Sequence, residues 1–336
     1  MLRAMQGIAT SDADLVLAFL READGDPVPA EALAGKLGLQ PAALFHAVRE
    51  LRDQGYEIDS LAKQGYRLIA APDPLDAQTL SSLLTTRELG WAIHHHSSLP
   101  STSDEAIALA RAGAAQGEVV IADRQTAGRG RRGRSWLSPP KVNLHLSVIL
   151  RPDLPPQRAP ELVSLVAVAA AETLRELGVP ARIKWPNDLV VEGRKLAGIL
   201  LDLSAEADRI HHVVVGVGFN LNITLDDFPE ELRPLVSSVR LETGAPVPRA
   251  AVVASFLAIL EGWLDRFADE GFAPVRARYR ELSSILGKPV RMSEADRSLE
   301  GVAEEIDESG ALLIRKSDGS VERFLSGDIT SLRVSG

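Results

Sequence analysis

The sequence predicts an α+β protein built of three parts. Helical periodicity dominates the first 70 residues, strands then alternate with long helices to about residue 285, and only short strands and turns follow. No apolar run approaches the roughly 18 residues that cross a bilayer, and the N-terminus lacks the basic-then-apolar order of a secretory signal. With 45% apolar residues and no cysteine, we expect a cytoplasmic protein with no membrane partner, a sizeable core and no disulfide or thiolate chemistry.

Residues 1–70 are predicted to form a winged helix-turn-helix domain. Three helices are expected, from Asp12 to Arg21, from Pro29 to Gly38, and from Pro41, a residue accepted at the first helical position, to Gly55. In the third helix the pattern places Leu44, Phe45, Val48 and Leu51 inward. Two alternating strands, Tyr56–Ile58 and Tyr66–Ile69, flank a turn at Lys63–Gly65 and complete the wing.

This fold commonly inserts its third helix into the DNA major groove. The polar groups available there are Gln40, His46 and Arg49. However, residues 1–70 carry seven Lys or Arg against ten Asp or Glu, a net charge of −3. A winged helix that serves structure or dimer contacts is therefore an open alternative. The total charge of −9 restricts any DNA contact to a local patch.

Residues 75–285 are predicted to form one mixed α/β domain after a stiff linker at residues 70–74. Its expected helices are Ser103–Ala112, capped by Thr102 or Ser103, Glu161–Leu177 and Ala250–Asp269. Its expected strands are Glu118–Ala122, Val142–Leu150, Leu189–Val191, Lys195–Leu201 and Val213–Leu221. Residues 286–336 are predicted as a small β-barrel of five short strands, with hairpin turns at Ser309–Gly310 and Asp318–Gly319.

Residues 124–134 contain five arginines, separated by Gly128, Gly130 and Gly133. Glycine lets the backbone approach a ligand, exposed N–H groups can form an anion site, and guanidinium groups match phosphate or carboxylate. The stretch therefore predicts an anion-binding loop, with a solvated basic loop or a nucleic-acid patch as the alternative. The glycine spacing also resembles dinucleotide and P-loop motifs, but both need a helix directly afterwards, which Pro139 and Pro140 exclude.

Three glycines occur inside neighbouring predicted strands: Gly198, Gly216 and Gly218. Glycine within a strand often marks the place where a ligand approaches the backbone. Because strand residues alternate between faces, Gly216, Gly218 and Asn220 are expected on one face. The glycines then form a flat floor for a ring system, with polar ends supplied by Lys195, Asn220 and Gln125.

Four motifs occur in order: Gly128-Arg-Gly-Arg-Arg-Gly-Arg134-x-Trp136, Lys184-Trp-Pro-Asn-Asp188, Arg194-Lys-Leu-Ala-Gly-Ile-Leu200 and Gly216-x-Gly-x-Asn220. With a winged helix before them and a small barrel after them, they resemble the bifunctional form of biotin protein ligase, which is also a biotin operon repressor. The resemblance covers nearly the whole chain. It implies a central catalytic domain of the biotin/lipoate ligase type and a C-terminal SH3-like β-barrel.

The resemblance implies two half-reactions. Biotin and ATP, with Mg²⁺, give biotinyl-5′-adenylate and pyrophosphate, and a lysine of the biotin carboxyl carrier protein of acetyl-CoA carboxylase then takes the biotinyl group and releases AMP. It also implies operator DNA as a partner and a homodimer when adenylate is bound. A ligase whose winged helix does not bind DNA is the alternative. A purely ligand-sensing regulator is disfavoured by the presence of Lys195 and the arginine loop.

The resemblance assigns roles to residues at matching positions. Catalytic roles fall on Lys195, Arg129 and Arg131, and biotin contacts fall on these three and on Ser101, Thr102, Ser103, Gln125, Gly130, Gly198, Gly216 and Gly218. Adenylate contacts fall on Arg129, Arg131, Arg132, Arg134, Trp136, Lys184, Asn187, Asp188 and Asn220, with Asp188 as the carboxylate nearest Mg²⁺ and Trp136 at the adenine side. Arg333 matches a basic residue near the terminus, and DNA contacts fall on Gln40, His46 and Arg49.

The sequence departs from the family pattern at several positions. Ser103 stands at the place of an asparagine, Lys141 at that of a glycine, His145 at that of an aromatic residue in the pocket wall, and Gln40-Pro41 at that of Ser-Arg. Two histidine runs, His94–His96 and His211–His212, are expected at a surface or a sheet edge. Adjacent histidines in a strand face opposite sides, and neither cysteine nor a nearby carboxylate completes a zinc site.

Overall fold

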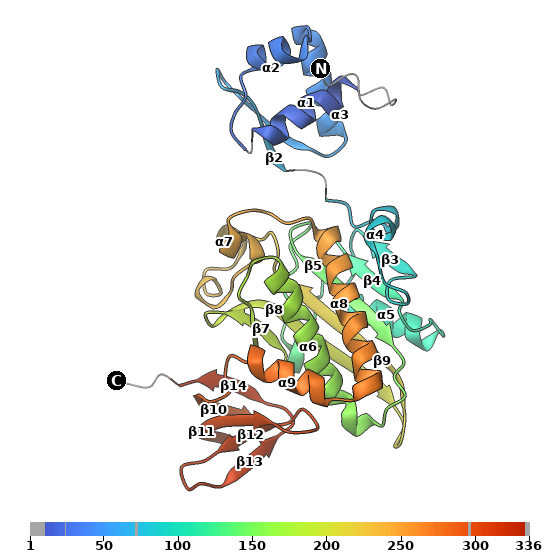
Figure 1. Ribbon diagram of the computed structural model, residues 1–336, viewed down its shortest axis with the longest axis vertical. Helices are drawn as coiled ribbons and strands as arrows, with labels where there is room; N and C mark the ends of the chain where they lie inside the picture. Colours follow the sequence, from blue (N-terminus) through green and yellow to red (C-terminus); the bar gives the residue numbers. More distant parts are fainter. Residues whose placement is uncertain (1–10, 24, 71–72, 295–296, 333–336) are drawn as a thin grey trace. The chain divides into compact units, whose positions relative to one another are not determined.

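The computed structural model describes residues 11–23, 25–70, 73–294 and 297–332; Arg333 lies outside them. The chain divides into two compact units, one up to Asp73 and one from Pro74 onward. Figure 1 shows the first unit in dark to mid blue and the second in the remaining colours. Among the described helices, none has both the length and the apolar character required to cross a membrane.

The first unit is the predicted winged helix-turn-helix. Helix α1 (Asp12–Glu22) begins after Ser11, whose hydroxyl accepts from the backbone N–H of Asp14. Helix α2 (Ala30–Leu37) ends at Gly38, where a φ of 67° favours glycine, and α3 (Pro41–Asp53) begins at its proline. Strands β1 (Glu57–Leu61) and β2 (Gly65–Ala70) pair antiparallel as the wing.

The prediction that Phe45 points inward is wrong. Helix α3 buries Leu44, Ala47, Val48 and Leu51, whereas Phe45 is 55% exposed. Successive residues on a helix lie about 100° apart, so burying residues 44, 48 and 51 turns residue 45 toward solvent. The small side chain of Ala47 takes the inward position instead.

A mixed seven-stranded sheet forms the centre of the second unit, in the order β3-β4-β5-β9-β8-β7-β6. Its strands are β3 (Ile93–His96), β4 (Val119–Ala122), β5 (Leu144–Leu150), β6 (Arg182–Lys184), β7 (Asp188–Val191), β8 (Arg194–Ala205) and β9 (Ile210–Phe219). Only the β3–β4 pair of this sheet is parallel. The first histidine run lies in the edge strand β3, as predicted, but the second lies in the central strand β9, where His212 is buried. The expectation of no nearby carboxylate is also wrong, since Glu118 lies 2.8 Å from His94 and Glu206 lies 3.1 Å from His211. Strands β3 and β6 were not expected.

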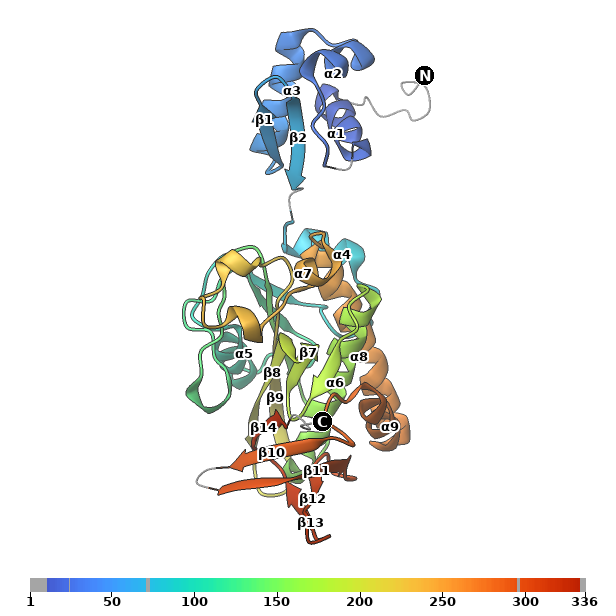
Figure 2. The same cartoon turned by 90° about the vertical axis from the view of Figure 1, so that its left-hand side faces the viewer.

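Helices cover both faces of this sheet (Figure 2). On one face α5 (Thr102–Arg111) packs Ala106 and Ala110 against alternate strand residues such as Val120 and Val214. The other face carries α6 (Ala159–Glu176), α8 (Arg249–Glu270) and α9 (Ala273–Leu282), which share the main core with the remaining strand residues. Two shorter helices, α4 (Ala77–Leu83) and α7 (Val239–Thr243), complete the unit.

The predicted cap of the helix after residue 100 is one residue too late. Ser101, rather than Thr102 or Ser103, accepts a hydrogen bond from the backbone N–H of Asp104 and caps α5. Thr102 and Ser103 therefore lie in the first turn of the helix, with their side chains free to face the sheet.

The C-terminal strands form the predicted small antiparallel domain. They are β10 (Pro289–Glu294), β11 (Arg297–Ile306), β12 (Leu312–Arg315), β13 (Val321–Phe324) and β14 (Asp328–Ser331), in the order β13-β12-β11-β10-β14. Ile306, Leu312 and Ile314 belong to the same core as the central sheet. This shared core, which includes Ile329 of β14, holds β14 beside the central domain, where Asp328 contacts the arginine loop.

Candidate active site

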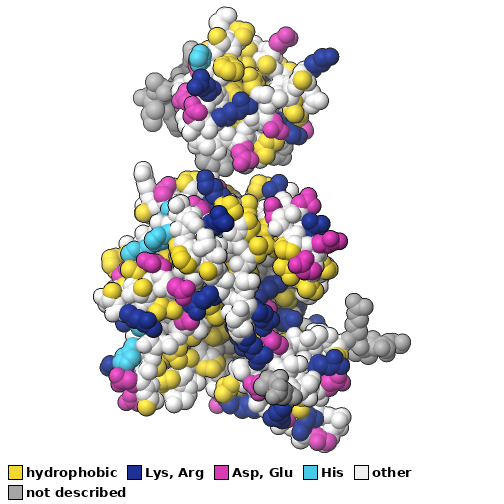
Figure 3. All heavy atoms as spheres, turned by 180° about the vertical axis from the view of Figure 1, so that it is seen from behind, with side chains coloured by type: hydrophobic (Ala, Val, Ile, Leu, Met, Phe, Trp, Pro, Cys, Tyr) yellow, Lys and Arg dark blue, Asp and Glu magenta, His cyan; other side chains and the backbone are white. Residues whose placement is uncertain are grey.

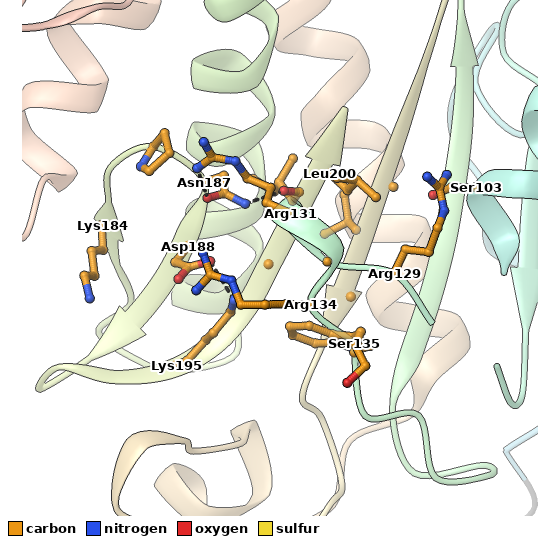
Figure 4. Close-up of a pocket in the computed structure, with 18 of the residues that line it drawn as sticks. Ser103, Arg129, Arg131, Arg134, Ser135, Lys184, Asn187, Asp188, Lys195 and Leu200 are labelled. Carbon is orange, nitrogen blue, oxygen red and sulfur yellow. Dashed lines mark hydrogen bonds and ion pairs between the residues drawn. The ribbon is translucent and has the colours of Figure 1, made fainter. Parts of the chain in front are cut away.

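A cavity of about 360 Å³ lies in the second unit, on the α5 face of the central sheet. Lys and Arg side chains gather beside a hollow on this side of the molecule (Figure 3). The arginine loop, the β6–β7 turn and strands β8 and β9 contribute to its wall (Figure 4). Strand β14 contributes Asp328, Ile329 and Thr330. The lining includes Ser101, Thr102, Ser103, Gln125, Arg129, Gly130, Arg131, Arg134, Trp136, His145, Lys184, Asn187, Asp188, Lys195, Gly198, Gly216, Gly218 and Asp328.

The three strand glycines form the floor of this cavity. Gly198 on β8 pairs with Gly218 on β9, which in turn pairs with His145 on β5, so the three positions make one row across the sheet. Gly216 pairs with Ser147 in the next row on the same face. A Cβ at Gly218 would lie 2.6 Å from the indole of Trp136, and one at Gly216 would lie 2.5 Å from Ser103 Oγ. A side chain at Gly216 or Gly218 would therefore displace Ser103 or Trp136, and one at Gly198 would press on Trp136 and Lys195.

Hydroxyl and amide groups meet at one end of the floor. Gln125 Oε1 accepts from the backbone N–H of Thr102 at 2.8 Å and from its hydroxyl at 3.1 Å. Ser147 Oγ lies 2.9 Å from Thr102 Oγ1 and 3.2 Å from Ser103 Oγ. Thr102, Ser103 and Ser147 are buried. This hydroxyl cluster offers both donors and acceptors to a small polar ring.

Cationic groups line the other end. The arginine loop makes a short 3₁₀ turn, Arg131–Gly133, in which Arg132 has a φ of 55°. Arg131 donates to Asn187 Oδ1 at 3.0 Å, and Figure 4 shows the two side chains meeting. Burial, together with the neighbouring charge of Arg132, lowers the pKa of Arg131. Arg129 instead forms ion pairs with Asp104 at 3.0 Å and Asp202 at 2.9 Å.

Asp328 on β14 holds two further arginines of the loop. Its carboxylate lies 2.9 Å from Arg132 Nη1 and 2.6 Å from Arg134 Nη2. Burial opposes ionisation of this carboxyl, but the hydrogen bond from Arg134 and the charges of Arg134, Arg132 and Arg131 hold its pKa below the ordinary value. The C-terminal domain thus supplies the counter-charge that positions the loop.

Lys195 belongs to the cationic end and lies beside Gly198 of the floor. Its Nζ is 2.7 Å from Asp188 Oδ1 and 5.2 Å from the ring centroid of Trp136. The indole itself covers Gly198 and Gly218, so it occupies part of the floor that was predicted to lie under a ligand ring.

His145 lies in the wall of the cavity, at the position where the family pattern has an aromatic residue. Its side chain is 1% exposed, and neither ring nitrogen has a hydrogen-bond partner in the described part of the chain. Burial, and secondarily the positive charge of Arg249, lowers the pKa of His145 to about 3. The ring is therefore neutral at physiological pH.

Two predicted site residues do not line this cavity. Arg132 points to Asp328, and Asn220 is buried, where it donates to the backbone oxygens of Ser237 at 3.0 Å and Lys195 at 3.3 Å. The expectation that Asn220 lies on the ligand face beside Gly218 fails because β9 ends at Phe219. Conversely, sequence reasoning missed Asp328, whose position depends on how a distant strand docks.

The residues predicted to contact DNA lie on α3 or directly before it. Gln40 precedes the helix, and His46 and Arg49 lie on it, all three exposed. They belong to the first unit, whereas the residues that line the cavity belong to the second.

Comparison with known families agrees with this arrangement. Residues 98–220 match the biotin/lipoate A/B protein ligase family. Residues 285–330 match the biotin protein ligase C terminal domain, and residues 13–67 match an HTH domain. The chain is also 34% identical to the bifunctional ligase/repressor BirA of Bacillus subtilis, over 94% of this chain and 97% of that one.

The chain belongs to the biotin protein ligase family. Its similarity to the bifunctional ligase/repressor BirA of Escherichia coli is 32% identity over 92% of this chain and 94% of the relative. Among solved structures, the biotin protein ligase of Aquifex aeolicus in complex with biotin and ATP has a TM-score of 0.63 at 27% identity, covering 73% of this chain and 100% of that one. The predicted resemblance and the predicted order of domains are thus confirmed.

Proposed function

We propose that this chain is an ATP-dependent biotin protein ligase. It joins biotin to ATP as biotinyl-5′-adenylate and then passes the biotinyl group to a lysine of the biotin carboxyl carrier protein of acetyl-CoA carboxylase. The observation that carries the proposal is a single cavity with a hydroxyl cluster at one end and Lys195, Arg131 and Arg134 at the other. One end suits a cyclic urea, and the other suits a carboxylate and phosphates.

In the first half-reaction, a carboxylate oxygen of biotin attacks the α-phosphorus of ATP. The bond from that phosphorus to the bridging oxygen of the β-phosphate breaks, and pyrophosphate leaves. The two reactants are anions, so local positive charge must offset their repulsion. At an effective dielectric near 20, one cation 4 Å from an anion contributes about 4 kcal/mol, and the loop supplies several cations without any side-chain nucleophile.

The roles follow from position. Thr102, Ser103 and Gln125 bind the urea of biotin, and its rings lie along the glycine floor beside the Trp136 indole that covers Gly198 and Gly218. Lys195 exchanges Asp188 for the carboxylate oxygens of biotin, and Arg131 binds the α-phosphate. Ser101, Arg129 and Gly130 position the loop and helix around these groups, while Arg134, Trp136, Lys184 and Asn187 face the nucleotide.

Magnesium enters with the nucleotide as part of the substrate. The described residues contain no cluster of three or more metal-binding side chains, which fits a magnesium ion held by one carboxylate and substrate phosphates. Asp188 is the carboxylate for that role, and bound Mg²⁺ would neutralise charge on the departing pyrophosphate.

In the second half-reaction, the amine of the carrier lysine attacks the acyl carbon of the adenylate. The bond from that carbon to the phosphate oxygen breaks, AMP leaves, and the amine loses a proton to solvent. The decisive test is incubation with biotin, Mg-ATP and a carrier domain, followed by intact mass of the carrier. No mass gain on the carrier, and no adenylate on the enzyme, would reject the function.

We further propose that this chain is also a biotin-responsive transcriptional repressor. We propose its domain boundaries as 1–70 for the winged helix, 75–285 for the catalytic domain and 286–336 for the C-terminal domain. Support comes from the exposed Gln40, His46 and Arg49 on the winged helix and from the bifunctional relatives. Operator DNA is bound by a homodimer that forms with adenylate. A gel shift on the promoter of the chain's own biotin operon, with biotin and ATP, tests this. Absence of a shift at low salt would favour a ligase whose winged helix does not bind DNA.

A further inference from the structure

His145 occupies a defined place between the two ends of the cavity. It belongs to the same row across the sheet as Gly218 and Gly198, which leads toward Lys195. It lies two residues from Ser147 on β5, so both side chains face the cavity about 7 Å apart along the strand. The imidazole is therefore near the hydroxyl cluster but one row closer to the cationic end.

The polarity of the two ends orients the ligand of the proposed function. A cyclic urea has two N–H donors and a carbonyl acceptor, which match the mixed donors and acceptors of Thr102, Ser103 and Ser147. A carboxylate needs the cations at Lys195 and Arg131. Biotin bound in this direction places its sulfur-containing ring in the middle, at the row that contains His145 and beside the Trp136 indole that covers Gly198 and Gly218.

His145 also has unused hydrogen-bonding capacity. Its ring is neutral, so it carries one N–H donor and one acceptor nitrogen. Both nitrogens are buried and unpaired among the described residues, and burying such groups without a partner costs free energy. The other polar side chains of the deep wall, Thr102, Ser103, Gln125 and Ser147, hydrogen-bond one another, so His145 is the polar group there that a ligand would satisfy.

We propose that His145 determines specificity for the sulfur-containing ring of biotin, by donating a hydrogen bond from its neutral ring to the thioether sulfur. This inference rests on the proposed function. A thioether is a weak acceptor, so the contact discriminates between related ligands more than it provides overall affinity.

Desthiobiotin, which keeps the urea and the carboxylate but lacks sulfur, isolates this contact. Calorimetric titration of full-length wild-type protein and of His145→Phe with biotin, desthiobiotin and ATP is the experiment. We expect His145→Phe to raise the Kd for biotin by about three- to tenfold, the range of one modest hydrogen bond. The Kd values for desthiobiotin and ATP should stay within about twofold.

Two further variants sharpen the result. Ser147→Ala removes a hydroxyl from the urea end, so it should weaken biotin and desthiobiotin by the same factor. His145→Asn keeps a side-chain donor and should recover part of the preference for biotin. If His145→Phe fails to bind ATP, and is therefore misfolded, the comparison of biotin with desthiobiotin is made with His145→Asn instead.

Three outcomes count against the proposal. They are an unchanged Kd for biotin in His145→Phe, an equal loss for biotin and desthiobiotin, and a full loss of preference in a folded His145→Asn. A wild-type protein that binds ATP but neither biotin nor desthiobiotin would instead reject the ligase function itself. The two failures are therefore distinguishable.

Discussion

Lys195 and Asp188 form an ion pair across the β7–β8 hairpin, with Nζ 2.7 Å from Oδ1. Both side chains line the cavity, and each is about one-third exposed. A partly exposed ion pair is worth little in stability, so its components are free to change partners. In the proposed reaction Lys195 moves to the biotin carboxylate, while Asp188 turns to magnesium carried by the nucleotide.

Replacing Lys195 should abolish adenylate formation while leaving the protein folded. Loss of one preorganised donor at a developing negative charge costs about a hundred- to a thousandfold in rate. Biotin-dependent exchange of labelled pyrophosphate into ATP measures this step for Lys195→Ala. Lys288→Ala, which removes an exposed lysine outside the cavity lining, is the matched control. Near-normal exchange in Lys195→Ala would remove this residue from the mechanism.

Arg131→Ala should let biotinyl-adenylate leave the site faster. Its guanidinium reaches the cavity beside Asn187, and a hydrogen bond between charged groups contributes about 1.5–3 kcal/mol. We expect adenylate dissociation to speed up by about ten- to a hundredfold, measured by release of preformed labelled adenylate. Arg124→Ala removes an exposed arginine of the same stretch that does not line the cavity. Equal rates for both variants would contradict the role.

Asp328→Ala should loosen the arginine loop without unfolding the protein. The carboxylate contacts Arg132 and Arg134, but these are partly exposed pairs worth at most about 1 kcal/mol each. The loop should therefore become more sensitive to trypsin, which cleaves after arginine, and adenylate should be retained about fivefold less well. Glu322 on β13 also pairs with two cations, Arg297 and Lys316. Glu322→Ala should change neither the trypsin sensitivity of the loop nor the retention of adenylate. Unchanged cleavage in Asp328→Ala would show that β14 does not restrain the loop.

Much of this architecture was predictable because local rules and the global fold agree. The proline at the start of α3 and Gly38 at the end of α2 mark helix ends through backbone geometry alone. Gly198, Gly216 and Gly218 were predicted as a floor because glycine within a strand often marks the approach of a ligand to the backbone. The structure places them on one face of the sheet, with Trp136 and Ser103 directly above them.

The rest depended on contacts between distant segments. The position of Asp328 beside the loop follows from the docking of β14, about two hundred residues further along the chain. Charge pattern alone does not show that Arg129 turns to Asp104 and Asp202 while Arg131 turns inward. The burial of His145 follows from its row with Gly218, which needs the strand register.

Lys141→Gly should stabilise the second unit. Lys141 has a φ of 62°, in the left-handed region that costs a residue with a side chain about 1–2 kcal/mol. Glycine removes this strain but loses more backbone freedom on folding, about 0.5–1 kcal/mol, so the net gain should be about 0.5–1 kcal/mol. Urea unfolding measures it. Lys141→Ala loses the same charge but keeps the strain, and an equal gain there would assign the effect to charge.

His145 should make the protein sensitive to mild acid. Burial and the charge of Arg249 hold its folded pKa at about 3, below the ordinary 6.5, while Asp123 acts in the opposite direction. Below pH 6.5 the unfolded chain therefore binds a proton that the folded protein rejects, and stability falls as the pH drops toward 3. Between pH 6.5 and 5 this residue should remove about 1–2 kcal/mol from the free energy of unfolding.

The measurement is urea unfolding of wild type, His145→Phe and His145→Asn at pH 8, 6.5 and 5. Neither variant has a ring that titrates at this position, so both should lose less stability on acidification than wild type by that same amount, whatever their stability at pH 8. Parallel pH dependences in all three proteins would mean that the buried ring titrates with an ordinary pKa, and the lowered pKa of His145 would then be rejected.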